Sequence, residues 1–381
     1  MKPTCPTTTP NPLLDFSALP AFDRITPADI APAMTQLLAE CEAALQAVLQ
    51  PAFPADWLAL SKTLDVAVEK LGIAWGAIGH LNAVADTPEL RAAYTEQLPI
   101  VTEFFTRMGA DERLYAKYKA INPATLNAEQ AKARENSLRG FVLGGAELQG
   151  EAKARFAAIQ ERQAELAQTF SERVLDATDA WHCYTTKQEA AGLPADVLQA
   201  AAELAQADSA KDGVALTADS IKLTLKMPSY LPVMQFAYSS ALRQQLYRAY
   251  ATRASDLGQK PEWDNSAVMD EILALRAEEA QLLGYANFAE LSLVPKMADT
   301  PDQVTAFLRD LAARARPYAE KDVADLRAFA QQELGMADPQ AWDWTYISEK
   351  LKEARYAFSE QEVRQYFPAP RVLAGLFRIV E

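Results

Sequence analysis

Along most of the chain, apolar residues recur at steps of three and four, which predicts amphipathic α-helices. Several of these helices have a marked start. A Thr followed by Pro opens the predicted helices at Thr26, Thr87 and Thr300, because Thr is a good N-cap and Pro at the first helical position lacks only an N–H that would have no helical partner. Ser359 with Glu362 offers a further capping box. The pattern predicts a mainly helical protein.

The longest helical pattern covers residues 129–177 and contains two adjacent glycines, Gly144 and Gly145. Adjacent glycines weaken a helix interior and mark turns. We expect the pattern to break there into two antiparallel helices whose apolar faces pack together as a helical hairpin.

One segment departs from helical spacing. Apolar side chains at residues 221, 223, 225 and 227 alternate with Lys222, Thr224 and Lys226. Strict period-two alternation predicts a strand with one face in water. Residues 180–187 are a plausible partner strand, and the segment between the two is helical in pattern. The expected fold class is a mainly α, multi-lobed helical bundle with a small β insert near residues 180–227.

Composition supports this fold class and narrows the partners. Of 381 residues, 50% are apolar, which is enough for a large core, and only 14 are Gly, about half the usual share. The net charge is -14 and the sequence pI is about 4.8. Such a chain repels phosphate backbones and anionic lipids, and it has no concentrated basic stripe. Nucleic acid and membrane surfaces are therefore not expected as partners.

The chain also lacks signals for export. Its first residues contain no apolar stretch of the kind found in secretory signals. The most apolar segment, residues 71–85, is too short and too polar to span a bilayer. The cysteines Cys5, Cys41 and Cys183 form no C-x-x-C pair, which is typical of a reducing compartment. We expect a cytoplasmic protein.

Familiar catalytic patterns are missing. The two histidines, His80 and His182, are far apart, and no H-E-x-x-H pair of the kind that holds zinc on one helix face occurs. Cys183 next to His182 is not a nucleophile–base pair, because neighbours on a strand point to opposite faces. No nucleophile elbow, phosphate loop or dinucleotide fingerprint is present. The residues alone assign no catalytic residue, no metal ligand and no cofactor.

Two segments are dense in aromatic and basic residues. In the first, one helix face carries Arg243, Tyr247 and Tyr250, with Arg253 one turn further on. Tyr and Arg at such positions often lie along the protein surface with only their polar tips in water. The alternative is a wall that hydrogen-bonds a polar ligand such as a peptide backbone.

In the second segment, aromatic and charged residues lie close together in the sequence. Its candidate substrate-binding residues are Trp342, Asp343, Tyr346 and Lys350. Aromatic side chains with a polar group suit a surface that binds flexible chains. Packing between helices remains the competing interpretation for each of them.

At these two segments the sequence resembles the thimet-type oligopeptidases, a family of zinc metallopeptidases. The resemblance extends over nearly the whole chain in family order, and includes the stretches "HLNAVADTPELRAAY", "MPSYLPVMQFA", "LRQQLYRAYATRASD" and "WDWTYISEKLKEARYAFSEQEVRQYFPAPRVLAGLF". It implies a mostly helical metalloendopeptidase with a deep channel between two lobes, which cleaves short peptides. It also implies a zinc site of H-E-x-x-H plus a further Glu, whose motif Glu polarises a zinc-bound water.

In family order, the zinc motif follows the helix on which this chain ends. Val372, Leu373, Leu376, Phe377 and Val380 form the apolar stripe of that helix, and no stop signal follows it. We therefore expect the catalytic zinc-binding part to be absent, and the stripe to be exposed where that lobe docks. The expected domains are an N-terminal helical lobe, 1–122, and a second helical region, 123–381, incomplete at its C-terminus.

These expectations combine into one functional hypothesis. The chain is the N-terminal, non-catalytic part of a zinc-dependent oligopeptidase, it forms one wall of the substrate channel, and it is inactive alone. Its partners are oligopeptides and the missing catalytic lobe, supplied by the same or a separate chain. The alternative is a naturally short, zinc-free helical protein that binds peptides or acts as a scaffold.

Overall fold

The computed structural model describes residues 11–356 and 360–381, and leaves the side chains of residues 360 and 361 undescribed. The described residues are mainly helical with one two-stranded sheet, which confirms the expected fold class. They form two compact units. Within the described ranges, unit 1 contains residues 11–169 and 268–303, and unit 2 contains residues 170–267, 304–356 and 360–381. The domain boundary expected at residue 122 falls inside unit 1 and stays a prediction.

Unit 1 is built from helices joined by short turns. Its elements are η1 (Pro12–Leu14), α1 (Pro27–Leu49), α2 (Trp57–Leu60), η2 (Ser61–Asp65), α3 (Val66–Val84), α4 (Pro88–Gly109), α5 (Glu112–Ala120), η3 (Pro123–Thr125), α6 (Ala128–Leu143), most of α7 (Gly150–Ala180), most of α11 (Ser266–Leu282), and α12 (Phe288–Leu293). The short η2 is one turn of π-helix that joins α2 directly to α3.

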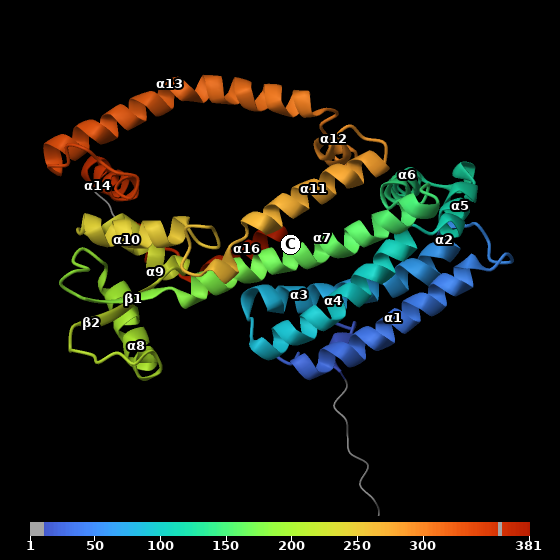
Figure 1. Ribbon diagram of the computed structural model, residues 1–381, viewed down its shortest axis with the longest axis horizontal. Helices are drawn as coiled ribbons and strands as arrows, with labels where there is room; N and C mark the ends of the chain where they lie inside the picture. The colour runs from blue at the N-terminus through green and yellow to red at the C-terminus, as the bar shows by residue number, and fades with distance from the viewer. Residues whose placement is uncertain (1–10, 357–359) are drawn as a thin grey trace, which may run out of the picture. The chain divides into compact units, whose positions relative to one another are not determined.

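The core of unit 1 lies between α1, α3 and α4, which run side by side (Figure 1). Met34 and Leu37 of α1 meet Leu71 and Ile78 of α3 and Phe104 of α4, and all five are at most 3% exposed. Burying an apolar side chain of this size contributes about 1.5–3 kcal/mol. The predicted apolar spacing is therefore the contact surface of these helices.

The predicted helix starts are largely confirmed. Both the N–H and the hydroxyl of Thr26 donate to the Asp29 carboxylate at 2.9 and 2.6 Å, and Thr87 Oγ1 accepts from Leu90 N at 3.2 Å. Thr300 Oγ1 accepts from Gln303 N at 3.1 Å, and the Gln303 side chain in turn accepts from Asp299 N. Ser359 lies outside the described residues.

The break expected at the two glycines is confirmed, since α6 ends at Leu143 and α7 begins at Gly150. Gly145 has φ +81°, and a Cβ on it would come within 3.0 Å of the Phe156 ring. Any L residue there would be strained. Gly144 approaches the Gly109 carbonyl, where a Cβ would lie 2.9 Å from the oxygen.

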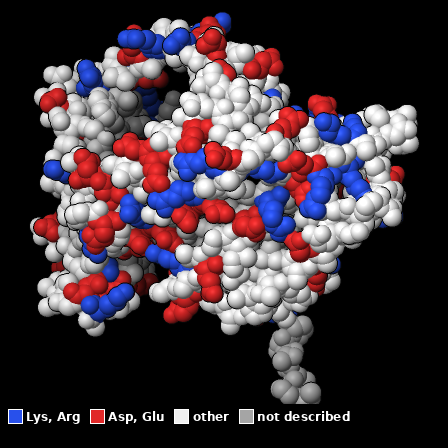
Figure 2. Space-filling model, turned by 45° about the vertical axis from the view of Figure 1, so that its right-hand side comes forward, with Lys and Arg blue, Asp and Glu red and all other residues white. Residues whose placement is uncertain are grey.

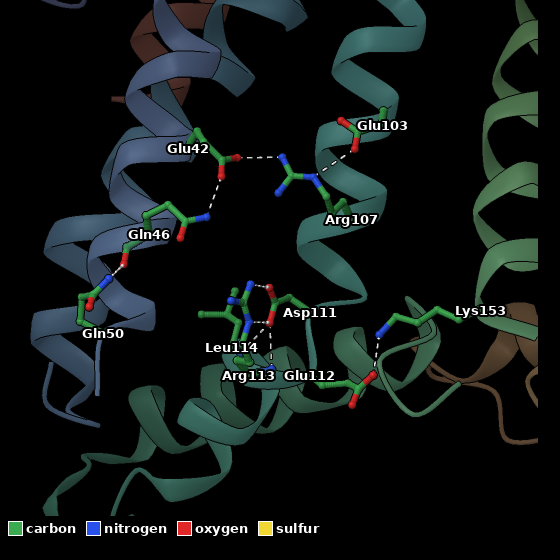
Figure 3. A network of polar contacts seen from close by, with 10 residues as sticks. All are labelled: Glu42, Gln46, Gln50, Glu103, Arg107, Asp111, Glu112, Arg113, Leu114 and Lys153. Carbon is green, nitrogen blue, oxygen red and sulfur yellow. Dashed lines mark hydrogen bonds and ion pairs between the residues drawn. The ribbon is translucent and has the colours of Figure 1, made fainter. Parts of the chain in front are cut away.

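Polar side chains tie the helices of unit 1 together at its surface (Figure 3). Arg107 of α4 donates to Glu42 of α1 at 2.7 Å and to Glu103 on its own helix at 3.0 Å. Lys153 of α7 pairs with Glu112 of α5 at 2.8 Å. These pairs are partly exposed, so each contributes little stability and mainly fixes how neighbouring helices align.

Unit 2 contains the rest of α7, the sheet and the C-terminal helices. Its further elements are β1 (His182–Thr186), α8 (Ala195–Asp212), β2 (Ser220–Thr224), α9 (Met227–Phe236), α10 (Ser240–Ala251), η4 (Pro261–Trp263), most of α13 (Pro301–Glu333), α14 (Trp344–Tyr356), α15 (Glu360–Arg364) and α16 (Ala369–Val380). Its main apolar cluster includes Ile221, Leu223, Val233 and Leu246, all fully buried.

The predicted strand pair is confirmed, with two corrections. β1 and β2 are antiparallel, with Cys183 opposite Leu223. The strand ends at Thr224, and Met227 already begins α9. The prediction of one wet face is wrong at Lys222, which is 6% exposed because α8 packs on β2 and places Asp208 and Asp212 over the ammonium group, each at 2.6 Å. A charged side chain that the alternating pattern assigns to solvent can thus be buried where a neighbouring helix supplies opposite charges.

The visible surface carries both signs of charge. Figure 2 shows Lys and Arg interspersed with Asp and Glu over the face in view, without a large area of one sign. Within the described ranges, no helix has the length and apolar character needed to cross a membrane.

Candidate functional site

The two aromatic and basic segments, 100 residues apart in sequence, meet at a buried ion pair in unit 2. Arg243 of α10 donates through Nη2 to Asp343 Oδ1 at 2.6 Å, and the two residues are 1% and 2% exposed. Asp343 directly precedes α14. We call the pair Arg243–Asp343 the clamp, since it joins α10 to the start of α14.

The clamp is satisfied by further hydrogen bonds. Arg243 Nη1 donates to the Ala237 carbonyl, and Asp343 Oδ2 accepts from Gln340 N at 3.0 Å. Ser240 Oγ donates to Asp343 Oδ1 at 2.8 Å and accepts from Trp342 Nε1 at 2.9 Å. Only Arg243 Nε lacks a partner among the described residues. Such bonding is what makes a buried charge pair tolerable.

Tyr346 and Lys350 lie beside the clamp on α14 and are half-buried. The Tyr346 ring covers the Arg243 guanidinium at 4.3 Å, and Lys350 Nζ lies 5.8 Å from the same ring. Lys350 also pairs with Glu353 at 2.8 Å. No hydrogen bond links the Tyr346 hydroxyl to another residue of the described part, and that hydroxyl is not among the buried unpaired atoms. It is therefore available to a ligand.

Tyr250 and Arg253 form a separate stack at the other end of α10. The Tyr250 ring lies on Tyr230 of α9 at 4.3 Å and 17°. The Arg253 guanidinium covers Tyr250 at 3.7 Å and donates to the Tyr250 carbonyl and to Thr178 Oγ1. Tyr247 lies between the two groups along α10, and the centroid of its ring is 6.3 Å from that of the Trp342 ring.

The structure thus divides the eight predicted residues by environment. Arg243 and Asp343 are buried, so in this form of the chain they position neighbours and do not meet solvent. Tyr346, Lys350, Tyr247, Tyr250, Arg253 and Trp342 remain partly exposed. Their role in a channel wall stays a prediction. Sequence reasoning missed the joining of the two segments, because no local pattern marks a pair formed between distant residues.

Sequence reasoning also missed a second face of α10. Gln244, Gln245 and Arg248 line a pocket of about 450 Å³ together with Arg253 and Trp181. The helical spacing of the two Gln and the Arg was the available signal.

The described residues offer no metal site, since no group of three or more His, Cys, Asp or Glu side chains is placed to hold an ion. His80 contacts the Phe22 ring edge at 5.3 Å, and His182 Nε2 lies 3.5 Å from Asp212. Burial raises the pKa of the Cys183 thiol to about 11, so it is protonated at neutral pH and unsuited to act as a nucleophile.

Comparison with known sequences gives two family matches in order along the chain. Residues 34–153 match "Neurolysin/Thimet oligopeptidase, N-terminal domain", and residues 233–381 match "Peptidase family M3". The chain is 45% identical to oligopeptidase A of Salmonella typhimurium over 97% of its length, and 38% identical to a probable cytosolic oligopeptidase A of Arabidopsis thaliana over 97%. Saccharolysin of Saccharomyces cerevisiae is 27% identical over 68% of the chain.

The matched share of these relatives is smaller. The chain covers 54% of the Salmonella protein, 53% of the Arabidopsis protein and 35% of saccharolysin. It therefore spans about half the length of the oligopeptidases A that it matches.

Proposed function

Because the chain belongs to peptidase family M3, we propose that it forms the N-terminal, non-catalytic part of a zinc-dependent oligopeptidase that hydrolyses short peptides in the cytoplasm. In this proposal, unit 2 contributes one wall of the substrate channel. The observation that carries the proposal is the 45% identity to an oligopeptidase A along 97% of this chain, over 54% of that relative.

The zinc ion implied by the family does not fit the described residues. Zinc sites need three or four His, Cys, Asp or Glu ligands within about 2.0–2.3 Å of one point, and no group of three such residues is placed for this in the described part of the chain. We therefore assign no zinc ligand and no general base to this chain, and we propose that zinc is held by a separate segment of the complete enzyme.

Two helices of unit 2 support the proposal of a further lobe. On α16, Leu373, Leu376 and Phe377 are 54%, 53% and 62% exposed. On α13, Phe307 and Tyr318 are 65% and 74% exposed. Large apolar surfaces of this kind are uncommon on free-standing proteins and mark contact sites. We propose that the lobe that the longer relatives carry beyond the matched region covers them.

The proposed wall uses the partly exposed aromatic residues beside the clamp. A channel that accepts many sequences must bind the peptide backbone, which polar tips and flat rings can do without selecting side chains. The Tyr346 hydroxyl, the Tyr247 ring and the Lys350 ammonium provide such groups, and the clamp behind Tyr346 restricts its movement. Rigid support lowers the entropy lost on binding.

The proposal is tested by association. The part of the Salmonella oligopeptidase A that this chain does not cover is co-expressed with this chain, and complex formation is followed by size-exclusion chromatography with light scattering. We expect a one-to-one complex. Two proteins that elute separately would overturn the proposal of a docking lobe. Peptide binding by the chain without any such complex would instead favour the alternative, a zinc-free peptide-binding or scaffold protein.

A further inference from the structure

A pocket of about 450 Å³ lies within unit 2, between the end of α7, one face of α10 and the loop after α10. Its volume is in the range of pockets that hold small molecules. Its lining residues are Ala177, Trp181, Ala241, Gln244, Gln245, Arg248, Ala249, Thr252, Arg253, Leu257, Gly258 and Gln259.

The lining is basic in an acidic protein. It contains two guanidinium groups, on Arg248 and Arg253, and no Asp or Glu, although the chain carries a net charge of -14. In addition, Gln244, Gln245 and Gln259 bring side-chain amides. A pocket with several donors, positive charge and no carboxylate is complementary to an anion.

These donors are available. The guanidinium of Arg248 makes no hydrogen bond or ion pair with any residue in the described ranges, and neither do the amides of Gln244, Gln245 and Gln259. In most of the other arginines that the structure places, the guanidinium is paired, as in Arg155 with Glu278 at 2.6 Å. Arg248 is exposed to solvent and needs no partner for stability.

The second guanidinium is held in place. Arg253 Nε donates to the Tyr250 carbonyl at 3.0 Å, and Nη1 donates to Thr178 Oγ1 at 2.9 Å. Its plane covers the Tyr250 ring at 3.7 Å. Three fixed contacts leave the remaining N–H groups of Arg253 preorganised for a ligand.

The loop that closes the pocket is fixed as well. Ala254 has φ 48°, an uncommon conformation for a residue other than Gly, and its carbonyl accepts from Asn265 N at 3.0 Å. At Gly258, a Cβ would lie 2.9 Å from the Ser255 carbonyl oxygen, so a larger residue would displace the loop. The wall of the pocket is therefore formed before a ligand binds.

Most of the remaining lining is apolar. Trp181 is 8% exposed, and it lines the pocket with Ala177, Ala249 and Leu257. An aromatic or aliphatic group can pack on this surface while an anionic group meets the guanidinium groups.

We propose that this pocket binds a small ligand in which a carboxylate stands next to a flat apolar group. Arg binds carboxylates through two parallel N–H···O bonds, and amide N–H groups can complete the coordination of the oxygens. Such a ligand can be the free C-terminus of a short peptide or a non-peptide organic acid. The peptide source rests on the proposed function, while the carboxylate site itself does not.

Isothermal titration of the purified chain tests the site with three probes. They are acetyl-Ala-Phe with a free carboxylate, the same compound as its C-terminal amide, and 3-phenylpropionate. We expect the free acid to bind roughly tenfold more tightly than the amide, since the amide loses the charged pair. Binding of 3-phenylpropionate with equal affinity identifies an organic-acid site, and clearly weaker binding identifies a peptide C-terminus.

Matched substitutions locate the binding. Arg248→Gln is expected to weaken free-acid binding by roughly tenfold or more without changing the thermal midpoint, because its side chain has no partner in the described protein. Arg316→Gln, at an arginine on α13 that is also exposed, is expected to leave binding unchanged. Equal binding of acid and amide, no binding at millimolar concentrations, or equal effects of the two substitutions would overturn the proposal. None of these results depends on catalysis, so the site can fail while the proposed function stands.

Discussion

The buried pair of Arg243 and Asp343 predicts that a single substitution can lower the stability of the protein strongly. Removing one partner of a buried pair leaves a charge in an apolar environment, which costs far more than breaking an exposed pair. We expect Asp343→Asn to lower the free energy of unfolding by about 3–5 kcal/mol, measured by urea denaturation.

The control for this prediction is Asp310→Asn. Asp310 pairs with Arg314 at 2.8 Å, but both side chains are more than half exposed. We expect a change of at most about 0.5 kcal/mol there. If the two substitutions cost the same, Arg243 and Asp343 do not form the clamp.

Tyr346 gives a prediction that separates packing from binding. Its hydroxyl has no partner among the described residues, so Tyr346→Phe should change the free energy of unfolding by no more than about 0.5 kcal/mol. A loss of about 1 kcal/mol would indicate a hydrogen bond to another helix. In the proposed complex of this chain with a catalytic lobe, the same substitution should raise KM for peptides, and an unchanged KM would contradict the wall that we propose.

At the scale of helices and strands, much of the structure could be predicted from local pattern. Thr26 and Thr87 begin their helices as expected, because capping and the fixed φ of Pro act within one turn. The strand around Leu223 was visible for the same local reason. The burial of Lys222 could not be predicted in this way, because it depends on α8, which places Asp208 and Asp212 beside the ammonium group. The alternation of residues along the strand carries no information about that helix.

The cluster around Lys222 predicts how stability depends on pH. The hydrogen bond from Lys222, with that from Tyr184, lowers the pKa of Asp212 from 3.8, and the charge of Lys222 adds to the effect. Burial by itself lowers the pKa of Lys222. The hydrogen bonds to Asp208 and Asp212 outweigh this effect, so the pKa of Lys222 is raised. A carboxyl group with a lowered folded pKa stabilises the protein above its unfolded pKa, and this contribution is lost as the pH falls through the folded value.

We therefore expect Lys222→Met to make the free energy of unfolding less dependent on pH between about pH 5 and about pH 2, because Asp212 then titrates nearer its ordinary pKa. Urea denaturation at a series of pH values measures this slope. Lys226→Met is the control, since Lys226 is 63% exposed and 3.2 Å from Asp179. If the free energy of unfolding of Lys222→Met depends on pH as in the wild type, the cluster around Lys222 does not determine how stability falls in acid.

The exposed apolar face of α16 leads to a prediction about dye binding and association. Its side chains Leu376 and Phe377 are 53% and 62% exposed, so the chain should bind a hydrophobic dye or self-associate. Leu376→Glu should reduce dye fluorescence and weaken association with the complementary part of oligopeptidase A. Arg371→Glu, on the same helix but outside the stripe, should leave dye binding unchanged. Equal dye binding by wild type and Leu376→Glu would place the exposed apolar surface elsewhere.

At the scale of the whole molecule, sequence and structure contribute different things. The family follows from matches that occur in order along the chain, at residues 34–153 and 233–381, and from 45% identity to an oligopeptidase A over 97% of the chain, so it could be predicted without any structure. The candidate site could be predicted only as two segments. Their meeting at Arg243 and Asp343 depends on tertiary packing that no local pattern encodes. The same holds for the pocket that Arg248 of α10 lines together with Trp181 and Leu257.

Hydrolysis of a quenched fluorescent oligopeptide in the presence of zinc tests the central claim most directly. The assay compares this chain alone, the uncovered part of the Salmonella oligopeptidase A alone, and the two co-expressed. We predict no cleavage above buffer by this chain alone, and cleavage by the pair that a chelator abolishes, because in our proposal the residues that would hold zinc belong to the other part. Chelator-sensitive cleavage by this chain alone, or an inactive pair that nevertheless forms a complex, would contradict the account.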